Sequence, residues 1–261
     1  MTRRYFLIDG AMVHDALCAS PLFTDSTLNW YVALLSGEHR RLAGPLLIDM
    51  NLLEEEDATT TLSVHEVLNG FTGRLHVSQL QSEKDLTFLA HHLQRFTCFY
   101  DEDFLLLGLR LADTRILAHL PNVFTPQQWS EMTAPIQQWT FSDRRGDGVA
   151  LALPEERASV IPEKKQFALS AAQLEILIDA TEPDILLDTL TYTPPMMENR
   201  LYDYWHLAQQ CVQIWQQSGS RDREVLRQFA MKVFNSKGKV LQEQDWVTLL
   251  SRATPQDIFA L

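Results

Sequence analysis

The chain has 261 residues, of which 46% are hydrophobic and 21% charged, and its formal net charge is -12. This composition is typical of a folded protein with a sizeable core and excludes a largely disordered chain. Acidic residues outnumber basic ones both before and after Leu153, so the charge argues against nucleic-acid binding through phosphate contacts. No apolar stretch approaches the length of a membrane span, and we expect neither a nucleic acid nor a membrane as partner.

The three cysteines, Cys18, Cys98 and Cys211, are far apart in the chain and odd in number. This usage is typical of reduced thiols in a cytoplasmic protein rather than of a disulfide framework. The chain starts with basic residues, but Asp9 interrupts the apolar run that a signal peptide requires. The sequence therefore predicts a cytoplasmic location.

The N-terminal part of the chain alternates apolar strands with helices. Strands are expected at Tyr5–Ile8, Asn29–Leu35 and Leu46–Met50, and helices at Ala11–Ala19 and Thr61–Asn69. This order of elements is typical of an α/β or α+β fold with a mixed sheet.

A strand and an amphipathic helix come next. The alternating run at Leu75–Gln79 predicts the strand, and Ser82 stands where the N-cap of the following helix is expected. Apolar residues at helical spacing give that helix one buried face. These residues are Leu86, Leu89, Ala90 and Leu93.

A β-hairpin is expected after this helix. Phe96–Tyr100 is aromatic and β-prone, Asp101–Asp103 forms a polar turn, and Phe104–Leu111 is a long apolar run. A continuous apolar run is typical of a strand that is buried on both faces. Asp113 is placed to cap a short helix, and Thr125 precedes a proline that starts another.

The chain changes character after Leu153. A last pair of strands, at Trp139–Phe141 and Val149–Leu153, is followed by a stretch with two prolines and a charge run. Beyond that stretch, Ser170 is placed to cap a helix and Pro183 to start a second one. Further helices are expected at Met196–Gln217, Arg223–Phe234 and Gln242–Arg252.

We therefore predict an N-terminal mixed-sheet α/β lobe at residues 1–153, a linker at 154–169 and a C-terminal all-helical lobe at 170–261. Aromatic residues on the long helix of the second lobe include Tyr202, Tyr204, Trp205 and Trp215. Large rings supply much of the buried area of a small helical bundle. An aromatic-rich helix can also offer a docking groove, and these four residues are the predicted partner contacts.

No catalytic pattern is present in the sequence. It has no glycine-rich phosphate loop, no G-x-S-x-G elbow, no H-E-x-x-H and no C-x-x-C. His91 and His92 are adjacent, so on a helix they point about 100° apart and share a metal poorly. We assign no catalytic, cofactor-binding or metal-binding residue and expect no cofactor. An enzyme with a site assembled from scattered Asp, Glu and His residues stays the alternative.

The order of motifs resembles a known family. A strand with Ser78, an amphipathic helix and a hairpin across an acidic turn lead to the run Arg110–Leu117. This arrangement is similar to the type VI secretion effector-chaperone (adaptor) family, which usually has an Arg-aromatic-aromatic-Asp-Pro-Arg-hydrophobic-Leu run here. Four positions of that run match, namely Arg110, Asp113, Arg115 and Leu117, whereas Leu111, Ala112 and Thr114 depart from it. The opening strand with Asp9-Gly10 and the later Gly44-Pro45 extend the resemblance over roughly residues 4–141.

The resemblance implies a function without catalysis. Such an adaptor binds the N-terminal segment of a toxic effector in the cytosol and loads it onto the VgrG-type spike protein of a bacterial type VI secretion system. The motif residues are expected to be structural: Gly44, Pro45, Ser78, Arg110, Asp113 and Arg115. The helical lobe is expected to contribute partner selectivity. Besides an unrecognised small hydrolase or other enzyme, a purely structural subunit of a larger assembly is a third reading.

Overall fold

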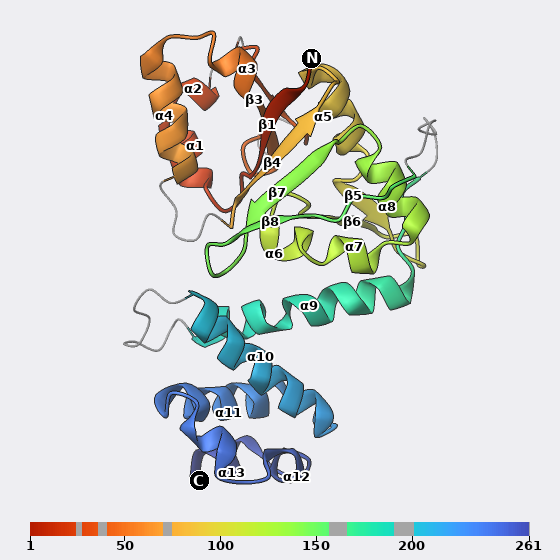
Figure 1. Cartoon of the computed structure of the whole chain (residues 1–261). Coiled ribbons are helices and arrows are strands. Elements are labelled where there is room, and N and C mark those ends of the chain that lie inside the picture. The colour runs from red at the N-terminus through yellow and green to blue at the C-terminus, as the bar shows by residue number, and fades with distance from the viewer. Residues whose placement is uncertain (25–27, 36–40, 70–74, 157–165, 191–200, 261) are drawn as a thin grey trace. The chain divides into compact units, whose positions relative to one another are not determined.

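The computed structural model describes residues 1–24, 28–35, 41–69, 75–156, 166–190 and 201–260. The chain divides into two compact units, Met1–Leu177 and Ile178–Leu261 (Figure 1). A sheet with helices forms the first unit and helices alone form the described part of the second, which confirms the predicted fold class. The predicted linker stays a prediction, because its residues 157–165 lie outside the described residues.

A six-stranded antiparallel sheet is the frame of the first unit. Its strand order is β2-β3-β1-β4-β7-β8, and a separate hairpin pairs β5 with β6. The strands are β1 (Arg3–Asp9), β2 (Tyr31–Ala33), β3 (Pro45–Asp49), β4 (Val77–Ser82), β5 (Cys98–Tyr100), β6 (Leu106–Gly108), β7 (Gln138–Ser142) and β8 (Gly148–Ala150).

Helices cover both faces of this sheet, and each face has its own core. The helices are α1 (His14–Ala19), α2 (Pro21–Thr24), α3 (Met50–Leu53), α4 (Ala58–Asn69), α5 (Leu86–Gln94), α6 (Thr114–Leu117), α7 (Leu120–Val123) and α8 (Pro126–Thr133). Tyr5 and Leu7 of β1 belong to the core with α5 and α8, whereas Phe6 and Ile8 belong to the core with α1 and α4. Because strand side chains alternate between faces, a strand between two cores is apolar throughout.

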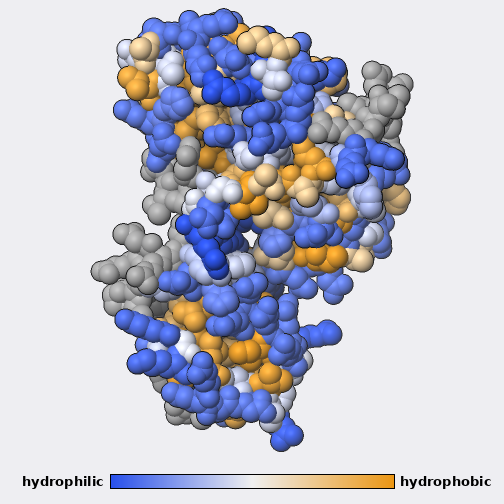
Figure 2. Space-filling model, viewed as in Figure 1, coloured by the Kyte–Doolittle hydropathy of each residue, from blue (hydrophilic) through white to orange (hydrophobic). Residues whose placement is uncertain are grey.

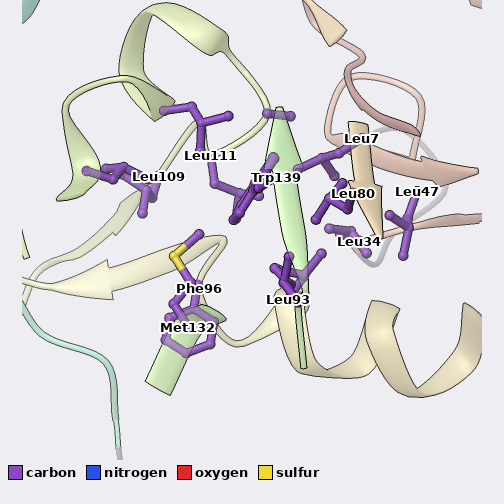
Figure 3. Packing of buried hydrophobic residues seen from close by; sticks show 14 of the residues in the cluster. Leu7, Leu34, Leu47, Leu80, Leu93, Phe96, Leu109, Leu111, Met132 and Trp139 are labelled. Atoms are coloured by element: carbon purple, nitrogen blue, oxygen red, sulfur yellow. The ribbon is translucent and has the colours of Figure 1, made fainter. Parts of the chain in front are cut away.

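The core beside α5 and α8 is built around Trp139 of β7 (Figure 3). Its ring stacks on that of Trp129, with centroids 6.3 Å apart and planes 15° apart. The indole N–H donates to Ser78 Oγ at 2.9 Å, which satisfies both buried polar groups. Burial of each large apolar side chain of this kind stabilises the fold by about 1.5–3 kcal/mol.

One predicted helix cap is wrong. Ser82 does not cap α5, because β4 continues to Ser82, which pairs with Arg3 of β1. The Ser82 hydroxyl instead donates to the Pro135 carbonyl at 2.6 Å. Asp85 is the N-cap, and its carboxylate accepts from the Phe88 N–H at 2.8 Å. The predicted cap Asp113 is confirmed, and so is the helix start at Thr125-Pro126, where Thr125 forms a capping box.

The rest of the described chain is helical. Its elements are α9 (Ala171–Leu190), α10 (Leu201–Gln217), α11 (Arg223–Asn235), the 3-10 helix η2 (Lys239–Gln242), α12 (Trp246–Leu250) and α13 (Pro255–Ala260). The predicted helix start at Pro183 is wrong, because α9 continues through it. A proline inside a helix costs about 3 kcal/mol; the buried Leu177, Leu186 and Leu190 on either side offset this cost. The predicted helix residues 196–200 lie outside the described residues. None of the described helices has the length and apolar character needed to cross a membrane.

The buried His92 predicts a pH-dependent stability. Its Nε2 lies 2.8 Å from the Met132 carbonyl, and burial lowers the pKa of the imidazole from 6.5 to about 4. Between these values the unfolded chain takes up a proton that the folded chain does not, so stability falls as the pH falls. We expect this group to cost roughly 3 kcal/mol of unfolding free energy on going from pH 7 to pH 4.

Urea unfolding of the wild type and His92→Gln at several pH values between 7 and 4 measures this effect. The wild type should lose more stability than the variant over that range. His91→Gln is the matched control, because His91 is exposed on the same helix. Parallel pH profiles of wild type and His92→Gln would contradict the assignment.

Candidate functional site

The carboxylate of Asp9 lies at the end of β1, where it is 4% exposed. Its Oδ1 accepts from the backbone N–H groups of Ala11 and Met12, at 3.0 and 3.3 Å, and thereby fixes the turn into α1. Its Oδ2 accepts from Arg110 Nε at 3.0 Å, across 101 positions of sequence. Burial raises the pKa of Asp9, and the neighbouring Arg110 guanidinium opposes that rise.

A second buried carboxylate, that of Asp113, continues this cluster. It caps α6 by accepting from the Arg115 N–H at 3.0 Å. It also binds the Arg115 guanidinium through both oxygens, at 2.9 and 2.7 Å, and lies 3.4 Å from an Arg110 nitrogen. Two acids and two arginines therefore alternate, which compensates the charges of the buried carboxylates.

The backbone at Gly10 and Gly44 approaches too closely for a side chain. The Gly10 N–H donates to the Gly44 carbonyl at 3.1 Å. A Cβ atom at Gly10 would lie 2.2 Å from the carbonyl oxygen of Leu42, and one at Gly44 would lie 2.7 Å from the Leu35 side chain. This contact holds the segment before β3 beside Asp9.

A cleft of about 470 Å³ lies beside these residues. One wall consists of Asp9, Gly44 and Pro45, and another is made by β6 with the following Leu109 and Arg110. Three of the predicted motif residues, Gly44, Pro45 and Arg110, thus line the cleft, and Arg110 joins two more, Asp113 and Arg115, in the ion-pair cluster. Ser78 is elsewhere, buried under Trp139.

The hairpin beside the cleft carries an exposed apolar run, and here the sequence prediction is wrong. Phe104, Leu105 and Leu106 are 80%, 59% and 60% exposed, whereas a strand buried on both faces was expected. The run crosses from the tight turn into β6, where Leu107 is half-buried against the core, and Leu109 is the first fully buried residue after the turn. On the face shown in Figure 2, apolar side chains gather in the lower part of the first unit, where Figure 1 draws α6, α7, β5 and β6.

Phe104 is held in an unfavourable backbone conformation. Its φ is 60°, in the left-handed region that is rare for a bulky residue. Asp101 stabilises the turn, because its Oδ1 accepts from the N–H groups of Asp103 and Leu105 at 2.9 and 2.8 Å. This site was not predicted from the sequence. The only signal there is that an acidic turn is followed at once by a run of large apolar residues.

The predicted partner residues belong to α10 in the second unit, and all four are half-buried. Tyr204 stacks on Phe234 with centroids 5.8 Å apart, and the Trp215 indole donates to the Asp222 carbonyl at 3.2 Å. Tyr202 stacks on His206 at 5.8 Å and lies 6.3 Å from the Trp205 ring. Tyr204 and Trp215 thus have structural contacts of their own, and partner binding by the four residues stays a prediction.

Side chains that could ligate a metal ion are not grouped among the described residues. No cluster of three or more His, Cys, Asp or Glu among them could hold a metal ion. Both oxygens of Asp9 already accept hydrogen bonds. Cys98 also lines the cleft, and it is a free thiol like Cys18 and Cys211.

Comparison with known proteins gives one match. Residues 4–131 match the model of a family described as "Domain of unknown function (DUF4123)". The matched stretch is just under half of the chain and includes the Asp9–Arg110 ion pair, the cleft and the hairpin. Comparison with curated proteins and with solved structures gave no match.

Asp113→Ala tests the role of the ion-pair cluster in stability. The variant loses a helix cap and leaves the Arg115 guanidinium, 21% exposed, without its carboxylate. We expect the unfolding free energy to fall by about 3 kcal/mol. Asp85→Ala is the matched control, because Asp85 is an exposed cap with one hydrogen bond to the backbone; it should cost about 1 kcal/mol. Equal losses in the two variants, measured by urea unfolding, would contradict the role of the cluster.

Proposed function

We propose that this protein is a non-enzymatic adaptor of a bacterial type VI secretion system. It binds the N-terminal segment of a toxic effector in the cytoplasm and loads the effector onto the VgrG-type spike protein. The resemblance of the motif order to the effector-chaperone family supports this function, and the domain match over residues 4–131 covers the same part of the chain. The observation that carries the proposal is the exposed run Phe104–Leu106.

An exposed apolar run is costly to a protein that acts alone. Covering a large apolar side chain contributes about 1.5–3 kcal/mol, so three such residues form the centre of a substantial interface. Contiguous apolar surface of this kind is typical of partner-binding sites. The left-handed conformation at Phe104 also favours a binding role, since strained backbone gathers at functional sites.

The motif residues suit a scaffold rather than a reaction. The Arg110 guanidinium lies 3.0 Å from the Asp9 carboxylate and 3.4 Å from that of Asp113. An arginine held by two buried carboxylates fixes the chain that leaves the hairpin. This role requires no nucleophile or base, in keeping with the absence of a catalytic motif from the sequence.

One observation favours an enzyme as the second candidate. Asp9 lines the cleft and its pKa is raised, as is common for catalytic acids. A hydrolase of this kind would cleave generic ester or phosphate substrates, and Asp9→Asn would abolish that activity. Substrate turnover by the purified wild type that is lost in this variant would replace the adaptor proposal.

Affinity co-purification from the native cells under secretion-active conditions tests the adaptor function. The tagged wild type should recover one large effector and a spike protein, both identified by mass spectrometry. Deleting the gene should lower the effector's cellular level, because its apolar surface is no longer shielded. Recovery of neither protein would contradict the proposal.

Phe104→Gly separates binding from folding. Glycine adopts the left-handed conformation without cost, so the variant should be as stable as the wild type or more stable, by up to about 1 kcal/mol. Loss of the exposed ring should nevertheless lower effector recovery several-fold. Lys237→Gly is the matched control, because Lys237 is the other described non-glycine residue with a positive φ, at 56°. Undiminished recovery by Phe104→Gly would contradict a role for the run.

The helical lobe is proposed to select the partner. Replacing residues 170–261 with those of a relative should switch which effector is recovered and leave the spike protein in the complex. Co-purification of the chimera measures this directly. Recovery of the original effector would show that selectivity resides in the first unit.

A further inference from the structure

We propose that the outer edge of β6 is a docking site for an extended peptide segment that adds to the hairpin as a third strand. The segment has alternating apolar side chains and carries a basic residue beside the turn at Asp101–Asp103. The natural source of this segment rests on the proposed function, in which it belongs to the effector. The chemistry of the site itself follows from four features of the first unit.

The first feature is a free row of backbone hydrogen-bonding groups. Leu109 N–H donates to the Thr97 carbonyl and Asp101 N–H to the Leu105 carbonyl. In an antiparallel pair the inward-facing residues alternate with outward-facing ones. The N–H and C=O groups of Leu106 and Gly108 therefore point away from β5, and no strand of the described residues pairs with them.

The second feature is room for another strand. Leu106, Leu107 and Gly108 line the cleft. A Cβ atom built at Gly108 would meet no atom within 4 Å, so no neighbouring residue crowds the face of the hairpin at this position. Edge strands in soluble proteins are normally covered by another element or carry charged side chains. In the described part of the chain, the outward-facing positions of β6, Leu106 and Gly108, have neither and lie beside the cleft.

The third feature is apolar side chains at the same edge. Leu106 is 60% exposed, and Phe104 and Leu105 precede it in the chain. Strand addition takes affinity from backbone hydrogen bonds and selectivity from alternate side chains. A segment whose alternate residues are apolar would cover this run while pairing with Leu106 and Gly108.

The fourth feature is a group of acidic side chains at one end of the edge, which accept hydrogen bonds from backbone N–H groups, as Glu102 does from Ala171 at 2.9 Å. Asp101, Glu102 and Asp103 form no ion pair with a basic side chain of the described residues. At the other end, Arg110 is already paired with two carboxylates. A lysine or arginine of the added segment is therefore expected beside the turn. A second copy of this chain is disfavoured as occupant, because each copy has a net charge of -12.

The edge of β8 provides a matched comparison. By the same alternation, Gly148 and Ala150 direct their backbone groups outward, and a Cβ atom at Gly148 would also meet nothing within 4 Å. No large exposed apolar residue lies on β8. Gly108 and Gly148 therefore occupy equivalent places on two sheet edges. The edge of β6 carries an exposed apolar run, whereas the edge of β8 does not.

Selection of a displayed library of random twelve-residue peptides on the wild-type protein tests the proposal. The enriched peptides should alternate apolar residues and carry lysine or arginine near one end. The Kd of the most enriched peptide is then measured by fluorescence anisotropy. Gly108→Pro removes an outward N–H and should weaken this peptide at least ten-fold, whereas Gly148→Pro should leave its Kd unchanged.

A second measurement does not depend on how the variants fold. Two forms of this peptide are made, one with N-methyl groups on the odd-numbered backbone amides and one with them on the even-numbered amides. Only one of the two forms should lose binding to the wild type, because only one set of amides faces β6. Three results would each overturn the proposal. They are equal binding of both N-methylated peptides, equal Kd values for the two proline variants, and enriched peptides that lack the alternating apolar residues or the basic residue near one end. A wild-type dimer in sedimentation that Gly108→Pro dissociates would assign the edge to a second copy instead.

The outcomes separate this inference from the adaptor function. If Gly108→Pro still recovers the effector and spike protein as the wild type does, the docking edge is wrong and the adaptor function stands. If peptides bind the edge as described but the wild type recovers no effector, the adaptor function is wrong and the docking edge stands.

Discussion

The position of the hairpin depends on the carboxylate of Asp9. This group ends β1, fixes the turn toward α1 through the N–H groups of Ala11 and Met12, and holds Arg110 across 101 positions of sequence. Since Arg110 is the second residue after β6, the ion pair ties the hairpin to the sheet. The close contact of Gly10 with Gly44 places a second segment at the same point. The cleft is the space that these contacts leave beside β6.

Local patterns in the sequence predicted the elements well. The alternate side chains in the middle of β1 enter two different cores, and therefore all of them are apolar. This unbroken apolar run can be recognised in the sequence alone. The cap at Asp113 and the helix start at Thr125-Pro126 were also predictable, because both depend on residues that are near neighbours in the chain. Ser82 failed as a cap because strand pairing with Arg3 decides its place, and such pairing is a long-range effect.

The candidate site was less predictable for the same reason. The motif residues Gly44 and Arg110 were found from their order in the chain, but the partner of Arg110 lies on β1 and nothing local identifies it. Hydrophobicity predicted that Phe104–Leu106 would be buried, whereas tertiary structure leaves these residues exposed. A run that violates the burial rule without structural compensation is where a binding function is expected.

Amide hydrogen exchange of the purified protein, with and without the effector that we propose as its partner, tests the central claim most directly. The account predicts that effector binding slows exchange at the amides of Leu106 and Gly108, the outward-facing pair of β6. The equivalent amides of Gly148 and Ala150 on β8 should exchange at unchanged rates. Protection confined to α10, with β6 exchanging as in the free protein, would contradict the account.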